Sequence, residues 1–242
     1  MLKSFSAMIL AAGYGRRMLS LTKDIPKPLV KVHNVSLLKN CIDFLFKIGC
    51  EKIVINTHYK HVLISDFINQ FYTTLNIKIS YEKNILDTAG GVKNAAQLFD
   101  YKDVLVTNSD IFWKEENKKD VINLISNYNS KDECRLLLVE KDKAYGIINK
   151  TGDFSLDKNL VKRWKTSDKV IYYSGLQMIA LDIIKDYNST EFSFNEVWDC
   201  QIKKRKLYGN LMSSNCYHVG NLTGLNYAKN STTWPYTFNA YL

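Results

Sequence analysis

The residues with the clearest chemical potential follow an apolar run near the start of the chain. Gly13 and Gly15 end the run that begins at Ala7, and the cations Arg17 and Lys27 come after them. Glycines let the backbone turn sharply and bring its N–H groups against an anion. Arginine offers phosphate oxygens a planar fork, and lysine adds a mobile positive charge. A strand, a glycine turn and two cations together predict a polyphosphate-binding loop.

The spacing of these residues excludes two common nucleotide-binding motifs. Met18 stands where the pattern G-x-G-x-x-G requires its third glycine, and no Gly-Lys-Ser/Thr follows at the P-loop spacing. The full string is Leu-Ala-Ala-Gly-x-Gly-x-Arg-Met, followed by Leu-Thr and Pro-Lys-Pro-Leu. It resembles the signature of the sugar-phosphate nucleotidyltransferases, also called NDP-sugar pyrophosphorylases. One departure is Ser20, where that family usually has proline.

The resemblance implies roles for the residues of this string. Its backbone and side chains would hold the nucleotide, and the residues concerned are Leu10, Ala11, Ala12, Gly13, Gly15, Arg17 and Lys27. Arg17 and Lys27 would also be catalytic, because they neutralise the charge of the reacting phosphates.

A second glycine-containing stretch, residues 86–95, has two interpretations. Thr88, Gly90 and Gly91 precede a helix that we expect to begin near Val92. This can be a plain helix entry with Thr88 near the N-cap, or bare backbone against which a planar base lies. The resemblance implies the second, because a Leu-x-Thr-Gly-Gly-Gly loop in this region of the family helps to hold the nucleobase and ribose. Ala89 replaces the first of those glycines.

Two polar residues follow the strand expected at 103–107. Asn108 and Asp110 would then lie at the carboxyl end of a parallel strand, where open α/β sheets place their ligands. The resemblance implies that Asp110 is catalytic and holds Mg²⁺, a hard cation that keeps several waters and shares its shell with phosphate oxygens. It assigns Asn108 to both nucleotide and substrate binding.

The second metal ligand of the family has no direct equivalent here. His218 stands where the family commonly has an aspartate, and Asn221 stands for a threonine. We take Asp110 and His218 as the candidate metal residues, although Mg²⁺ prefers oxygen to imidazole. Alternatively Asp110 holds the ion with phosphates and water, or another carboxylate contributes, and His218 hydrogen-bonds a phosphate.

The sugar-binding residues are implied by two further stretches. The strand expected at 171–179 resembles the Tyr-Thr-Gly strand of the family and makes Tyr173, Ser174 and Gly175 substrate-binding candidates. A bulge at Ser174–Gly175 is an equally weighted structural interpretation. Asn195 belongs to a Phe-Ser-x-Asn-x-x-Trp-Asp segment that, with a terminal His-Val-Gly, resembles the N-acetylmuramate-1-phosphate uridylyltransferase-like branch.

Strand-like and helical patterns alternate along the first part of the chain. The spacing of apolar residues predicts strands at 51–57, 77–82 and 103–107 and helices at 36–48 and 61–72. Short connections between them imply right-handed crossovers and a largely parallel sheet. We expect a single α/β domain over residues 1–242, with a Rossmann-like, mixed and mainly parallel sheet flanked by helices. The resemblance implies the GT-A-like fold of nucleotide-diphospho-sugar transferases.

The second part of the chain is less regular. Its pattern predicts helices at 119–128 and near 192–199, strands at 135–139, 171–179 and 206–210, and a last helix that reaches 227–228. Residues 144–172 are polar, and we assign no strand there. The Glu-Lys-Pro motif with which many relatives contact the sugar is not evident. The resemblance places the nucleotide-binding half at about 5–115 and the sugar-binding half at about 116–232.

Composition favours a reduced, soluble, cytoplasmic protein. The 242 residues are 46% hydrophobic and 24% charged, and the five cysteines are scattered without a C-x-x-C pair. The net charge of +9 comes from lysines spread along the chain, so we expect no nucleic-acid partner. The apolar run at 5–12 is interpreted as a buried strand rather than a leader, and no segment is long enough for a membrane helix. His58 and His61 are interpreted as loop or surface residues rather than a metal pair.

The resemblance implies an enzyme that joins a nucleoside triphosphate to a sugar 1-phosphate and releases pyrophosphate, with Mg²⁺ as cofactor. By its branch, the best pair is UTP with N-acetylmuramate 1-phosphate. GTP or CTP with a mannose-, heptose- or choline-type phosphate is the alternative. A third possibility is a nucleotide-binding regulatory subunit that has lost catalysis, suggested by Ala89, His218 and Asn221.

Overall fold

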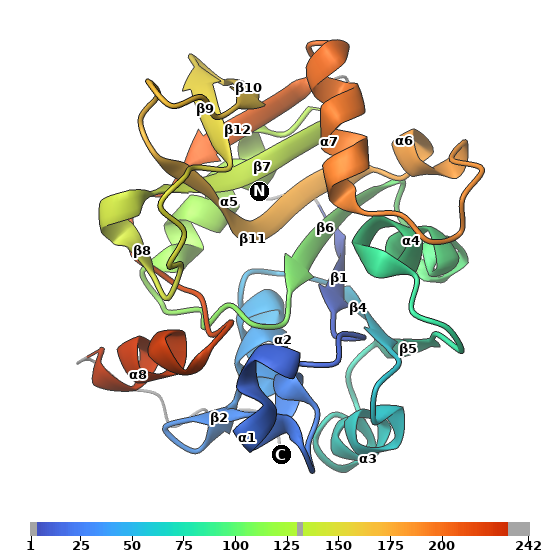
Figure 1. The fold of residues 1–242 in the computed structure, drawn as a ribbon. Coiled ribbons are helices and arrows are strands. Elements are labelled where there is room, and N and C mark those ends of the chain that lie inside the picture. Colours follow the sequence, from blue (N-terminus) through green and yellow to red (C-terminus); the bar gives the residue numbers. More distant parts are fainter. Residues whose placement is uncertain (1–3, 130–132, 232–242) are drawn as a thin grey trace.

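The computed structural model describes residues 4–129 and 133–231. A nine-stranded sheet runs through the molecule in the order β5-β4-β1-β6-β11-β7-β12-β10-β9 (Figure 1). Its strands are β1 (Ser6–Leu10), β4 (Lys52–Thr57), β5 (Ile77–Tyr81), β6 (Asp103–Asn108), β7 (Cys134–Glu140), β9 (Phe154–Asp157), β10 (Leu160–Arg163), β11 (Ile171–Ala180) and β12 (Leu207–Leu211).

The N-terminal part of the sheet is parallel. Strand β1 pairs in parallel with both β4 and β6, and β4 pairs in parallel with β5. Parallel neighbours need crossover connections, which here are the helices α2 (Leu37–Lys47), α3 (His61–Phe71) and α4 (Asp87–Asn94). Strand β11 then pairs antiparallel with β6 and β7. The predicted α/β fold, a mixed sheet flanked by helices, is confirmed.

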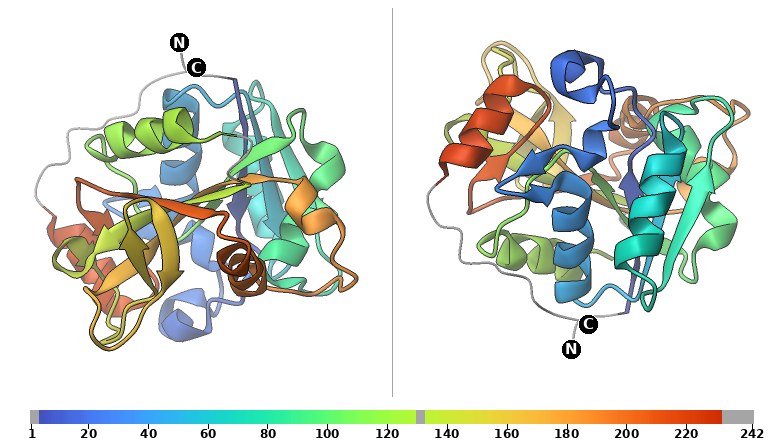
Figure 2. Two further views of the ribbon diagram at one scale, coloured as in Figure 1. Left: turned by 90° about the horizontal axis from the view of Figure 1, so that it is seen from above. Right: turned by 90° about the horizontal axis from the view of Figure 1, so that it is seen from below.

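Helices cover both faces of the sheet because the strands are apolar on both sides. On one face α2, α3 and α5 (Asn117–Asn127) pack in a core that includes Ile9, Ile55 and Leu105. On the other face α4, α6 (Asp182–Lys185) and α7 (Phe194–Lys203) pack in a core that includes Met8 and Val106. Figure 2 (left) shows α5 and α7 on opposite sides of the sheet.

A third, smaller core brings the C-terminal part of the chain to the N-terminal loop. Helix α8 (Leu222–Asn230) packs beside the short strand β2 (Lys31–Val32), as Figure 1 shows, and β2 pairs with β3 (Val35–Ser36). Met18 from the 3₁₀ helix η1 (Arg16–Met18) shares this core with Val219 and Leu225. The strands β13 (Cys216–Tyr217) and β8 (Ala144–Tyr145) pair next to it. This packing carries residues 218–220 to the loop that follows β1.

The hairpin formed by β9 and β10 is absent from the sequence prediction, which assigns no strand to residues 144–172. The two strands are four residues each, and Lys158 in the turn between them has a left-handed φ of 56°. Only Phe154 and Val161 of this hairpin are fully buried. A hairpin with so few buried residues leaves almost no apolar periodicity in the sequence.

The α4 helix begins earlier than predicted. It starts at Asp87 rather than near Val92, so Gly90 and Gly91 are helical residues and not a loop. The first N–H groups of a helix lack partners within it, and here Gly90 donates to the carbonyl of Phe192 at 3.0 Å. A distant segment therefore completes the helix start.

Side chains at the N-termini of three helices explain where these helices begin. Ser36 caps α2 through its hydroxyl, and Ser193 with Glu196 forms a capping box at the start of α7. Asn221 caps α8 by accepting from the backbone of Gly224.

Across residues 4–129 and 133–231, none of the helices combines the length and apolar character that a bilayer crossing requires.

Candidate functional site

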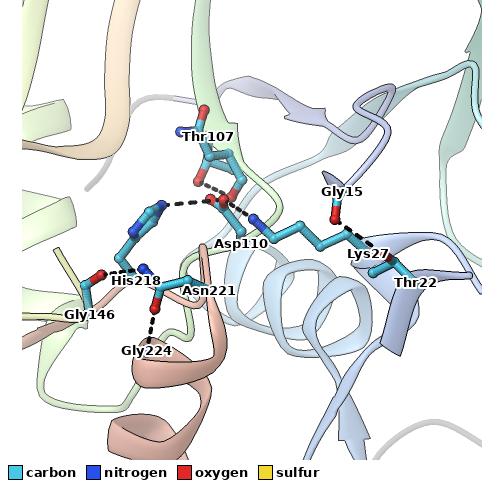
Figure 3. Close-up of polar contacts among 10 residues, drawn as sticks. Gly15, Thr22, Lys27, Thr107, Asp110, Gly146, His218, Asn221 and Gly224 are labelled. Atoms are coloured by element: carbon cyan, nitrogen blue, oxygen red, sulfur yellow. Dashed lines mark hydrogen bonds and ion pairs between the residues drawn. The ribbon is translucent and has the colours of Figure 1, made fainter. Parts of the chain in front are cut away.

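Lys27 and Asp110 meet at the carboxyl end of the parallel strands. Lys27 opens the short 3₁₀ helix η2 (Lys27–Leu29) after Pro26, and Asp110 follows β6. The Lys27 Nζ donates to the Asp110 Oδ2 at 2.5 Å, across 83 residues of sequence (Figure 3). The two side chains are only 12% and 14% exposed. The structure thus brings together two of the three candidate catalytic residues.

His218 is the third member of this cluster. Its Nε2 lies 3.3 Å from the Asp110 Oδ2, as Figure 3 shows. The backbone holds it there, because Val219 N–H donates to the Asp110 carbonyl at 2.7 Å and His218 N–H donates to the Tyr145 carbonyl at 2.9 Å. The register of the C-terminal segment therefore places the imidazole against the carboxylate.

The electrostatics of Asp110 follow from these neighbours. Burial alone would raise the pKa of Asp110, but the charges and hydrogen bonds of His218 and Lys27 outweigh it and hold that pKa well below its usual range. Asp110 is an anion at neutral pH. Its second oxygen, Oδ1, is buried and has no hydrogen-bond partner among the described residues.

The cluster offers a hard cation one free oxygen. An unpartnered, ionised carboxylate oxygen suits Mg²⁺, which takes one or two carboxylates and completes its shell with water and phosphate oxygens. Within the described part of the chain no group of three or more His, Cys, Asp or Glu side chains forms a closed metal site. The donor set therefore fits an open magnesium site at Asp110 and fits less well an ion bound through His218.

A cavity of about 370 Å³ opens in front of Lys27 and Asp110. Most of the residues expected to bind the nucleotide line it, and these are Leu10, Ala11, Ala12, Gly13, Gly15, Arg17, Lys27, Thr88 and Asn108. The candidate metal residue Asp110 lines it too. Arg16, Asn56 and Asp87 line it as well. A glycine-rich backbone, several cations and a carboxylate thus face one hollow, which is the arrangement that a metal-bound polyphosphate needs.

The two glycines of the loop have different structural reasons. Gly15 has a φ of 67°, and a Cβ there would lie 3.0 Å from the Cβ of Lys27. The Thr22 hydroxyl donates to its carbonyl at 3.0 Å and fixes the turn (Figure 3). A Cβ at Gly13 would meet nothing within 4 Å. Only Gly15 is therefore required by the turn itself, and it sets how closely Lys27 approaches the loop.

A second cavity, of about 390 Å³, adjoins the first. Asp87, Thr88 and Asn108 line both cavities, and His218 lines the second. Tyr173, Gly175 and Asn195, three of the candidate substrate-binding residues, line the second cavity. The Asp110–His218 contact therefore spans the boundary between two ligand-sized spaces.

The structure does not bring Ser174 to this cavity. The pairing of β11 with β7 shifts register between Tyr173 and Leu176, so a bulge is present at Ser174–Gly175. The Ser174 side chain is buried and its hydroxyl donates to the Leu137 carbonyl at 2.8 Å. The bulge turns Gly175 toward the cavity and Ser174 into the core.

Gly90 and Gly91 also lie away from the lining of the first cavity. Both are buried in α4, where a Cβ on Gly90 would come 2.3 Å from the Thr190 carbonyl oxygen. A Cβ on Gly91 would come 2.7 Å from the side chains of Asn56 and Glu82. The absence of side chains at these positions serves packing within the protein, and no contact of either glycine with a base follows from the structure.

We expect Gly90→Ala to destabilise the protein by about 1–3 kcal/mol, because overpacking against backbone outweighs the roughly 1 kcal/mol that alanine gains in a helix. Urea unfolding followed by circular dichroism measures the difference. Gly13→Ala is the matched control and should stay within about 0.5 kcal/mol of the wild type, since it has open space around it. Equal stability of all three proteins would contradict the packing role of Gly90.

Several lining residues escaped the sequence prediction. Asn149, Asp153 and Arg163 line the second cavity, and Asn56 and Asp87 line the first. The position of Asn56 at the end of a predicted parallel strand is the same signal that pointed to Asn108. Arg163 lies on the hairpin that the sequence does not reveal, so no local signal could have found it.

His58 and His61 each contact other residues of the protein. The ring of His58 bonds through Nδ1 to the Glu82 carbonyl and through Nε2 to the Tyr14 hydroxyl. The ring of His61 lies against that of Tyr81 with centroids 4.3 Å apart. His58 lies in the segment between β4 and α3, His61 is the first residue of α3, and both residues are half-buried.

Comparisons with known proteins give a consistent result. A family model described as nucleotidyl transferase matches residues 6–165. N-acetylmuramate alpha-1-phosphate uridylyltransferase of Caulobacter vibrioides is 30% identical over 88% of this chain and 91% of its own length. D-glycero-alpha-D-manno-heptose 1-phosphate guanylyltransferase of Campylobacter jejuni is 28% identical over 83% of this chain and 87% of its own.

Solved structures share the fold. HddC from Yersinia pseudotuberculosis, solved in complex with GMP-PN, has a TM-score of 0.72 at 22% identity and covers 93% of this chain and 98% of its own. The inositol-1-phosphate CTP transferase from T. maritima has a TM-score of 0.73 at 15% identity and covers 97% of this chain and 100% of its own. At such identities the likeness concerns the fold.

Proposed function

The chain belongs to the nucleotidyl transferase family, and we propose that this sugar-phosphate nucleotidyltransferase joins UTP to N-acetylmuramate 1-phosphate. The observation that carries the proposal is the contact of Lys27, Asp110 and His218 at the boundary of two cavities. The first cavity takes the nucleoside triphosphate, and the second takes the sugar.

The reaction is a displacement at phosphorus. A phosphate oxygen of the sugar 1-phosphate attacks the α-phosphorus, the bond from that phosphorus to the bridging oxygen breaks, and pyrophosphate leaves with the electron pair. The nucleophile is already an anion, so no strong general base is needed. Catalysis consists of positioning and of charge neutralisation.

The chain's own residues supply most of that neutralisation. Arg17 and the backbone N–H groups of the glycine loop bind the triphosphate oxygens. Lys27 lies between the two phosphates and reduces their mutual repulsion. Asp110, held by Lys27 and His218, has a buried Oδ1 without a hydrogen-bond partner among the described residues and would hold Mg²⁺. When bound, Mg²⁺ supplies further positive charge to the triphosphate and the leaving pyrophosphate.

The choice of substrates is supported by the 30% identity to the Caulobacter uridylyltransferase over most of both chains. N-acetylmuramate carries a carboxylate, and the second cavity is lined by the cation Arg163 together with Asp87, Asp153 and His218. The guanidinium is held in place by Asp199 and Asn195. The similarity to a heptose 1-phosphate guanylyltransferase makes GTP with a heptose 1-phosphate, whose sugar carries no carboxylate, the alternative pair.

A grid of nucleoside triphosphates against sugar 1-phosphates, read by pyrophosphate release, tests the proposal. We expect the highest kcat/KM for UTP with N-acetylmuramate 1-phosphate. A higher kcat/KM for GTP with a sugar 1-phosphate whose sugar is uncharged would replace the proposed pair by the alternative. Tight binding of a triphosphate without release for any sugar phosphate would point to a nucleotide-binding subunit that lacks catalysis.

A further inference from the structure

One buried carboxylate has no part in the proposed reaction. Glu82 follows β5 and is 2% exposed. Its Oε1 accepts from the Asn56 Nδ2 at 2.7 Å, and its Oε2 accepts from the Leu86 N–H at 3.1 Å. A buried carboxylate is costly unless its oxygens are paired, and here both are. The residues that pair with this carboxylate connect it to neighbouring parts of the fold.

Asn56 connects this carboxylate to the phosphate-binding loop. It is the penultimate residue of β4, is 3% exposed and lines the first cavity. Its Oδ1 accepts from the Ala11 N–H at 2.8 Å. On the other side of the same peptide, the Leu10 carbonyl accepts from the Ser109 N–H at 3.2 Å. The peptide at which β1 becomes the loop is therefore held at both its ends.

A second connection reaches the far side of the loop. The ring of His58 joins the Glu82 carbonyl, at 2.9 Å from Nδ1, to the Tyr14 hydroxyl, at 3.0 Å from Nε2. Glu82 thus contacts the loop at Ala11 through Asn56 and at Tyr14 through His58. Gly91 makes room for the first of these connections, because a Cβ there would lie 2.7 Å from both Asn56 and Glu82.

The direction of each hydrogen bond from Ala11 through Asn56 and Glu82 to Leu86 is fixed. The Ala11 N–H can only donate, so Asn56 must present its oxygen to it and its nitrogen to Glu82. The Leu86 N–H can also only donate, so both oxygens of Glu82 must accept. Burial raises the pKa of the Glu82 carboxyl, while the hydrogen bonds from Asn56 and Leu86 oppose that rise. The pattern fits the ionised form, since a proton on either oxygen would face a donor.

We propose that Glu82 and Asn56 are positioning residues, which orient the Leu10–Ala11 peptide and with it the loop that binds the nucleotide phosphates. The proposal rests on the assignment of the first cavity to the nucleotide, but not on the identity of the sugar. Neither residue touches the reacting atoms. Both act through the backbone of the loop, so their loss should weaken nucleotide binding.

A donor–acceptor swap tests the positioning role. In Glu82→Gln, the amide nitrogen must face the Asn56 nitrogen or the Leu86 N–H, so one donor loses its acceptor. An unsatisfied buried donor corresponds to roughly a 5- to 100-fold change in an equilibrium constant. We expect the Kd of Mg-UTP or Mg-GTP, measured by titration calorimetry well below the melting temperature, to rise by that factor.

The double variant Asn56→Asp/Glu82→Gln restores the chain in reverse. One oxygen of residue 56 then accepts from Ala11, the other accepts from the new glutamine, and the glutamine oxygen accepts from Leu86. The number of charges is unchanged. We expect the double variant to bind nucleotide more tightly than Asn56→Asp alone, which places the same carboxylate in the lining of the first cavity. Asn56→Asp alone should bind weakly, because it places two carboxylates face to face.

Glu51→Gln is the matched control, since Glu51 is an exposed carboxylate remote from the cavity, and its affinity should equal that of the wild type. Single variants with lowered melting temperatures but unchanged Kd would show a purely structural role and overturn the proposal. A double variant that binds nucleotide no more tightly than Asn56→Asp alone would also overturn the proposal. A wild type that binds nucleotide but releases no pyrophosphate would refute the proposed function and leave this test intact. If the wild type binds neither nucleotide, both proposals fail.

Discussion

Lys27→Ala is expected to lower turnover by about 10²- to 10³-fold, which is the usual cost of removing one preorganised charge from a reacting centre. Lys27 is nearly buried and lines the cavity assigned to the triphosphate. In the proposed reaction it would offset the repulsion between the α-phosphate and the incoming phosphate. Initial rates of pyrophosphate release with saturating substrates measure the effect.

Two controls separate the loss of the charge from a general disturbance of the fold. Lys31→Ala removes an exposed lysine of β2 and should leave turnover unchanged. Lys27→Arg keeps the charge but enlarges the head group, and it should retain more activity than alanine without reaching the wild type. The melting temperature of each variant shows whether it is folded. Turnover of Lys27→Ala within threefold of the wild type would contradict the role given to this residue.

Asp110→Asn is expected to reduce turnover by a similar factor of about 10²–10³. It removes the one ionised oxygen that is buried and free of hydrogen bonds in the cluster. If that oxygen holds Mg²⁺, the variant should also need a higher magnesium concentration for half-maximal activity. Titration of magnesium at fixed nucleotide tests this second effect, which a merely structural residue would not show.

Asp66→Asn, on the exposed side of α3, is the control for the loss of a carboxylate.

The pH dependence of folding stability offers an independent check of the charge on Asp110. Burial opposes ionisation of Asp110, but His218 and Lys27 depress its pKa in the folded state. Its charge therefore stabilises the fold above the unfolded pKa of about 3.9, and this stabilisation is lost as the pH falls below that value. The wild type should lose its advantage over Asp110→Asn in that acidic range. An unchanged magnesium requirement would argue against Asp110 as the metal ligand.

Much of the architecture could be predicted because its causes are local. The strands β4 and β6 contain continuous apolar runs, β5 alternates apolar and polar residues, and α2 and α3 have apolar residues at helical spacing. Burial on one face of a helix leaves apolar residues at helical spacing, and burial on both faces of a parallel strand leaves a continuous apolar run. Because parallel strands end at the same edge, the positions of the glycine loop and of Asp110 after two such strands already implied that they are neighbours.

The remaining features depend on what packs against a residue from far along the chain. Gly90 and Gly91 look like a ligand-binding loop in sequence, and only the approach of residues 190–192 and of Asn56 shows that they are helical contact sites. Ser174 turns inward because of a bulge that depends on the partner strand β7.

The sequence by itself thus determined the parallel half of the sheet, the glycine loop and the residues that could carry charge to a phosphate. The tertiary structure decided which of them face the cavities, where His218 meets Asp110, and that Arg163 enters the second cavity from a hairpin without apolar periodicity. It also decided that Glu82 reaches the loop through Asn56. The physical reason is range: propensity and periodicity act over a few neighbouring residues, whereas side-chain orientation and hydrogen-bond partners are set by segments brought together only when the chain folds.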